Sequence, residues 1–86
     1  MRADPHRALI RALLARYPAL EVLSGKSEPW ASATFIGARH ILDCTGPAPA
    51  GLEDEEFDLP GHLVADIAHY NDGDRVRVEA LIIEAF

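Results

Sequence analysis

Two carboxylates in the C-terminal third of the chain have the types and spacing for acid–base chemistry. Asp66 and Glu79 flank Asp72-Gly73, a strong signal for a two-residue hairpin turn between runs that alternate apolar and polar residues. Such a turn places Asp66 directly opposite Glu79 on one face of the hairpin. Like charges across a ladder repel, so we expect compensation by Arg77 or Arg75, by a histidine, by a metal ion or by a raised pKa that keeps one carboxyl protonated.

Histidines extend this pair into a candidate ligand site. His62 shares a face with Asp66, and His40 and Cys44 are expected on a neighbouring strand, which together are plausible zinc ligands. Zinc sites that can be read from sequence have paired cysteines or histidines a few residues apart, and this chain has none. The candidate ligand site is His40, His62, Asp66 and Glu79. We nevertheless expect no resident metal, no cofactor and no catalytic residue.

An N-terminal helix is predicted to cover the sheet that carries these residues. Asp4 is suited to cap a helix and Pro5 to its first position, and Pro18 ends it. The apolar residues between them recur at helical spacing and form one stripe. They are Leu9, Ile10, Leu13, Leu14 and Tyr17.

The first half of the sheet is less clearly specified. Leu20–Leu23 predicts a strand, and Ser24–Ser27 predicts the turn that follows it. Residues 30–43 are rich in strand-forming residues, but Gly37 interrupts their alternation. Either Gly37 is a bulge in one bent strand, which we favour, or Gly37-Ala38 is a tight turn between two short strands.

The second hairpin, residues 62–85, has two faces with different consequences. Leu63, Ala65 and Ile67 are expected to face the helix, together with the alternating apolar residues of the last strand. The opposite face then exposes Val64, Leu81 and Ile83. One helix cannot cover both faces, so these three residues are the candidate interface of a two-fold dimer.

Residues 44–61 form a long loop that carries the acidic cluster Glu53–Glu56 and ends at Phe57 and Leu59, which we expect to pin it to the core. The whole chain, residues 1–86, is predicted to be a single α+β domain. Its N-terminal helix packs on one face of a small, mainly antiparallel sheet of about four strands in α-β-β-β-β order. The long acidic loop lies between the second and third strands.

Charge and composition restrict the partners. The net charge of −6 divides unevenly, because residues 1–17 hold four arginines against Asp4, whereas residues 18–86 are strongly acidic. We expect the helix arginines to lie beside the acidic segment of the same chain or of a partner chain, and the acidic body argues against nucleic acid and membrane surfaces as partners. Cys44 is the single cysteine, which excludes an intrachain disulfide and favours a cytoplasmic protein.

Two functions of different classes are therefore expected from the sequence. The first is a small non-catalytic interaction protein that forms a homodimer through its sheet and engages another protein through its sheet and acidic loop. The alternative is a small-molecule or metal site, with possible acid–base catalysis, on the open sheet face around His62, Asp66 and Glu79.

Overall fold

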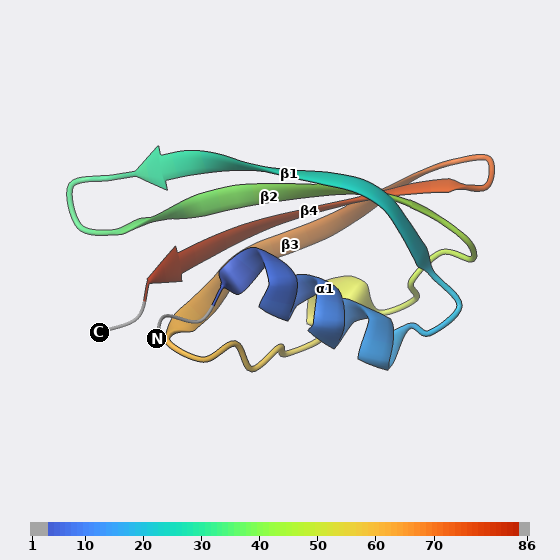
Figure 1. Cartoon of the computed structure of the whole chain (residues 1–86), viewed down its shortest axis with the longest axis horizontal. Coiled ribbons are helices and arrows are strands. Elements are labelled where there is room, and N and C mark those ends of the chain that lie inside the picture. The colour runs from blue at the N-terminus through green and yellow to red at the C-terminus, as the bar shows by residue number, and fades with distance from the viewer. Residues whose placement is uncertain (1–3, 85–86) are drawn as a thin grey trace.

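One helix lies against one face of a four-stranded antiparallel sheet in the computed structural model, which describes residues 4–84 (Figure 1). The helix, α1, covers Pro5–Arg16, and the sheet has the strand order β1-β2-β4-β3. The strands are β1 (Glu21–Ala31), β2 (Ile36–Thr45), β3 (His62–Asp72) and β4 (Arg75–Glu84). The predicted α+β arrangement in the order α-β-β-β-β is confirmed.

Helix α1 begins and ends where its sequence predicts. The Asp4 side chain accepts hydrogen bonds from the amides of His6, at 3.0 Å, and Arg7, at 3.4 Å, and Pro5 occupies the first turn. Leu9 and Leu13 are fully buried against the sheet. Within residues 4–84, no helix is both long enough and apolar enough to cross a membrane.

The core lies between α1 and the sheet. Alternate residues of β2 and β4 point to the helix side, which leaves the other face of the sheet without a covering layer in the described chain. Leu20, Leu52 and Leu59, from the connecting segments, complete the core. Its sheet residues are Leu42, Cys44, Ile67, Val76, Val78, Ala80 and Ile82.

The turn between β3 and β4 lies one residue later than predicted. Asp72 pairs with Arg75, so the two turn residues are Gly73 and Asp74. Gly73 has a φ of 63°, a conformation that glycine adopts without strain. The register is shifted by two residues, which leaves the β3 residues from Asp66 to Asp72 on their predicted faces, and Ile67 still faces the core.

A β-bulge at Ala65 reverses the facing of the first residues of β3. Between Val64 and Asp66 the register with β4 shifts by one residue. The predictions that Leu63 faces the helix and that Val64 faces outward are therefore wrong. Val64 packs against the core, whereas Leu63 is 56% exposed on the outer face.

The first hairpin also differs from the prediction. β1 continues through Ser24–Ser27, where a turn was predicted, and the turn between β1 and β2 lies at residues 32–35. There the amide of Ser32 donates to the carbonyl of Phe35 at 2.8 Å, and the Ser32 hydroxyl accepts from the Phe35 amide at 3.0 Å. The serine side chain therefore stabilises a turn that contains no glycine or proline.

Gly37 is neither a bulge nor a turn residue. It lies inside β2 in regular register, opposite Trp30 on β1 and Ile83 on β4. A Cβ atom at Gly37 would lie 2.0 Å from the carbonyl oxygen of Ile82 and 2.7 Å from the Cα of Ile83. Glycine is therefore required because the backbone of β4 passes so close.

The segment between β2 and β3 contacts both the helix and the core. It contains a short 3-10 helix, η1 (Leu52–Asp54), and its Phe57 packs against the core. Arg16 at the end of α1 bonds through Nε to the carboxylate of Glu55, which confirms for this arginine the expected pairing with the acidic segment. Tyr17 donates its hydroxyl hydrogen to a loop carbonyl, that of Ala50, at 2.9 Å.

Glu53 connects η1 to the free edge of β3. Its Oε2 atom accepts from the amide of His69 at 3.0 Å and lies 2.8 Å from the Nδ1 atom of the same residue. The pKa of Glu53 is lowered by a hydrogen bond from its own amide and by the amide and ring of His69, against an opposing effect of desolvation. The carboxylate occupies an edge position where another strand would otherwise pair.

Replacing Gly37 tests the close approach of β4. We expect Gly37→Ala to lower the free energy of unfolding by about 1–3 kcal/mol, because the β4 backbone must move away. Urea denaturation at fixed protein concentration would measure this change. In the control, Gly25→Ala, the new Cβ meets Leu42 Cδ2 at 2.9 Å and His6 Nε2 at 3.0 Å, and both are side-chain atoms that can rotate away. Equal losses in the two variants would contradict the explanation.

Stability should depend on pH through Glu53. Its lowered pKa in the folded chain means that its contribution is complete above the ordinary glutamate pKa and disappears as the pH falls through the folded value. Glu53→Gln should therefore lower the thermal midpoint near neutral pH and have a smaller effect in acid. Glu56→Gln, in the same loop, is the control and should change neither midpoint. A loss for Glu53→Gln that is the same at both pH values would count against a role for the charge.

Candidate functional site

The sheet separates the predicted ligand residues onto its two faces. His40 on β2 and His62 at the start of β3 lie on the side that faces α1. Asp66 and Glu79 lie on the outer face. The four side chains therefore do not converge on one point, because the backbone of the sheet lies between the histidines and the carboxylates.

Asp66 and Glu79 are not the directly opposed pair that the sequence predicted. Asp66 lies opposite Leu81, in the rung of the outer face next to that of Glu79. The later turn causes this difference, because the pairing of β3 with β4 is continuous from Asp66 to Asp72. Arg77, predicted to balance the pair, bonds instead through Nε to Asp43 Oδ1 at 3.3 Å.

Cys44 is a fully buried free thiol on the helix side of β2. Burial, and then the neighbouring Asp43 carboxylate, raise the pKa of this thiol. Because the thiolate is the form that attacks electrophiles and binds metals, Cys44 serves as an apolar core residue. It does not join His40 in a zinc site.

His40 instead contacts His6 and Ser27. The Nδ1 atom of His40 lies 3.0 Å from Nδ1 of His6 and 2.8 Å from the Ser27 hydroxyl oxygen. The same hydroxyl lies 3.0 Å from Nδ1 of His6. Three polar atoms from α1, β1 and β2 thus contact one another where the first turn of the helix meets the sheet.

His40 has an environment unlike that of a surface histidine. Its side chain is 2% exposed, and its Nε2 atom is buried without a hydrogen-bond partner. Burial, and then the neighbouring His6, lower the pKa of His40, and Asp4 opposes them weakly. The ring is therefore neutral at physiological pH, with a lone pair on one of its two nitrogens.

No role was predicted for His6, although one signal was available. His6, Leu9 and Leu13 are spaced by three and four residues, which places the imidazole on the stripe that faces the sheet. Ser27 carried no such signal, because it was assigned to a turn. Its position became clear only when β1 proved to continue beside His40.

The outer face of the sheet is apolar at one end. One row of paired residues crosses all four strands at this end. In strand order it consists of Trp30 on β1, Gly37 on β2, Ile83 on β4 and Leu63 on β3. We call these four residues the apolar row. Because Gly37 has no side chain, Trp30 and Leu63 are the neighbours of Ile83 along this row, and Ile83 is buried although none of the described elements covers the face. Leu81 follows in the next rung.

The other end of the outer face is polar. An open hollow of about 490 Å³ lies near the β3–β4 turn, where Arg77 pairs with Asp43. Tyr70 and Arg75 also line it. The side chains that it gathers are of both charges, so it does not favour a strongly acidic or a strongly basic ligand.

Comparison of the chain with protein-family models, with curated proteins and with solved structures gave no match. Nor does any group of three or more His, Cys, Asp or Glu side chains within residues 4–84 have the arrangement of a metal site. Functional inference therefore depends on two local features, the uncovered outer face of the sheet and the contact of His6, Ser27 and His40 beneath it.

Proposed function

We propose that this chain is a small, non-catalytic interaction protein that self-associates through the outer face of its sheet. The observation that carries the proposal is the apolar row, which lies on a face that no described element covers. Leu63 at the end of the row is 56% exposed. Burial of such a row against a second copy removes apolar surface from water, which is the main source of association free energy.

Apolar exposure continues from the row into the β1–β2 turn. Phe35 and Ile36 are 46% and 48% exposed, and they follow Trp30 across the turn. Figure 1 shows this hairpin projecting beyond the end of β4, away from the body of the molecule. A projecting apolar hairpin tip is better explained by a partner surface than by the fold of one chain.

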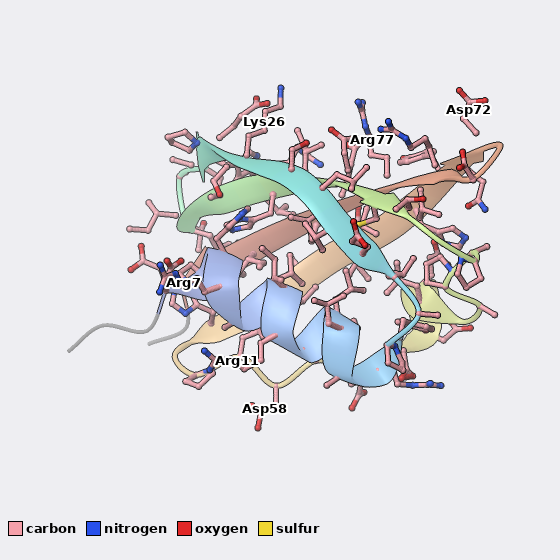
Figure 2. All side chains as sticks on the ribbon, turned by 45° about the vertical axis from the view of Figure 1, so that its right-hand side comes forward. Arg7, Arg11, Lys26, Asp58, Asp72 and Arg77 are labelled. Atoms are coloured by element: carbon pink, nitrogen blue, oxygen red, sulfur yellow. The ribbon has the colours of Figure 1, made fainter. Side chains whose placement is uncertain are left out.

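Charge on the outer face is compatible with a second copy of this chain. Every basic residue in the acidic body, residues 18–86, lies on this face: Lys26, Arg39, Arg75 and Arg77. Figure 2 shows Lys26 and Arg77 pointing away from α1. Glu28 lies opposite Arg39, so acids and bases alternate next to the apolar row. Repulsion between two chains of net charge −6 is therefore weaker here than across the acidic loop.

The size of the apolar end of the face limits the strength of the dimer. The molecule measures 38 × 23 × 21 Å, and the sheet extends along the longest axis. A standard interface buries roughly 800 Å² on each partner. An interface confined to the apolar end of the outer face is smaller than this, which is typical of weak, concentration-dependent association.

Association should depend on Leu63. We expect sedimentation velocity over a dilution series to give a mass that rises from 9.4 kDa toward twice that value in the wild type. Leu63→Asp should weaken association at least about tenfold, equivalent to about 1.4 kcal/mol, because it places a charge in the apolar row. A wild type that stays monomeric at every concentration would sink the proposal.

Tyr70→Asp is the matched control. Tyr70 lies on the same face of the same strand and is 57% exposed, but it is at the polar end of the face. Its replacement should leave association unchanged, and circular dichroism should show both variants folded. Equal dissociation by the two variants would place the interface elsewhere on the sheet.

A further inference from the structure

The contact of His6, Ser27 and His40 has an unusual geometry. The three polar atoms, two Nδ1 and one Oγ, are separated by 3.0, 3.0 and 2.8 Å, so they form a nearly equilateral triangle. Each atom comes from a different element, α1, β1 or β2. The triangle therefore exists only because the first turn of the helix is docked on the first hairpin.

Hydrogen bonding alone does not use this geometry fully. An imidazole nitrogen has a single in-plane direction, occupied either by a lone pair or by an N–H bond. Each Nδ1 atom nevertheless has two polar partners within 3.0 Å, so one direction must serve both. A hydrogen-bond chain through the Ser27 hydroxyl satisfies both nitrogens along two sides of the triangle, and the third side, between the two Nδ1 atoms at 3.0 Å, is left without a role.

The size of the triangle matches the coordination distances of a metal ion. Two ligand nitrogens that lie about 2.0–2.1 Å from an ion are about 2.9 Å apart when they are at right angles, as in six-coordinate sites, and about 3.4 Å apart in the tetrahedral sites that zinc prefers. The three measured separations of 2.8–3.0 Å fit three adjacent positions of a six-coordinate ion that keeps bound water. Imidazole nitrogens are also suitable ligands for zinc, copper and nickel.

Both rings are positioned before any ion binds. His40 is 2% exposed, so its ring is held in place by the residues packed around it. The amide of His6 is fixed by the Asp4 carboxylate at 3.0 Å. Gly25 leaves space for the His6 ring, because a Cβ there would approach its Nε2 atom to 3.0 Å. Little ordering remains to be done on binding.

We propose that His6, His40 and Ser27 form a binding site for a divalent transition-metal ion of the zinc class. The Nδ1 atoms of His6 and His40 are its two nitrogen ligands, and the Ser27 hydroxyl is the third ligand. Water occupies the remaining positions, since no group of three His, Cys, Asp or Glu side chains is assembled within residues 4–84. The site differs from the predicted ligand set, of which it retains only His40.

The surroundings of His40 also set a limit on affinity. Coordination through Nδ1 places the ring proton on Nε2, which is buried and has no hydrogen-bond partner. Histidine ligands in strong sites donate this proton to a carboxylate or a carbonyl group. We therefore expect weaker binding than in a closed structural zinc site, and an ion that exchanges readily with chelators.

Zinc titration of the chelator-treated chain tests the site. Isothermal titration calorimetry near neutral pH should give one Zn²⁺ per chain, and His6→Gln should weaken binding at least about tenfold. His69→Gln is the control, because His69 lies on β3, at the far edge of the sheet from β1, and pairs with Glu53. It should bind as the wild type does. A wild type that binds no zinc, or a His6→Gln chain that binds equally well, would overturn the proposal.

Ser27→Cys tests the third ligand without removing a histidine. A thiolate is a softer and stronger zinc ligand than a hydroxyl, so this variant should bind Zn²⁺ at least about tenfold more tightly. With Co²⁺ as the probe it should also gain a thiolate charge-transfer absorption that the wild type lacks. If the tighter binding is lost in the Ser27→Cys, His6→Gln double variant, residues 27 and 6 bind the same ion, as proposed. Unchanged affinity in Ser27→Cys rules out Ser27 as a ligand.

Discussion

The β-bulge at Ala65 is the constraint on which both faces of the sheet depend. It adds one residue to β3 without a partner on β4, so side chains before it point to the opposite side from a regular ladder. Val64 thereby lies opposite Ile82 and packs against the core, and Leu63 lies in the apolar row opposite Ile83. Without the bulge, Leu63 would join the core and the outer face would lose its exposed end.

Local signals predicted the helix and the second hairpin, whereas register and strand extension required tertiary contacts. The Asp4 cap and the Leu9/Leu13 stripe act within a few residues, so the sequence reveals them directly. The bulge has no such signal, because Ala65 is small and tolerated on either face. β1 was predicted too short for a similar reason: its residues are mostly exposed, so no apolar alternation marks it. The four predicted ligand residues do not meet, because the strand pairing and the bulge place the histidines and the carboxylates on opposite faces of the sheet. His6 contacts His40 only because the helix packs against the sheet.

In the strand order β1-β2-β4-β3, strands β1 and β3 form the two edges of the sheet. Different features oppose the addition of another strand at each edge. At the β3 edge, the Glu53 side chain accepts from the amide of His69, where another strand would otherwise pair. On β1, Pro29 removes one donor and Lys26 adds a charge, both features that disfavour edge-to-edge pairing. Growth of the sheet by strand addition is therefore opposed at both edges. The outer face, with its apolar row, is the surface that these devices leave free for a partner.

The two proposed sites occupy opposite sides of the same hairpin. Adjacent residues in a strand point to opposite faces. The Ser27–His40 pair therefore faces the helix, and the neighbouring Glu28–Arg39 pair lies on the outer face. The arms of this hairpin extend from the body of the molecule, and β1 is exposed along most of its length. A metal ion bound by His6, Ser27 and His40 would fasten both strands to α1 from below. The outer face would then be held in one shape for association, although its own side chains take no part in holding the ion.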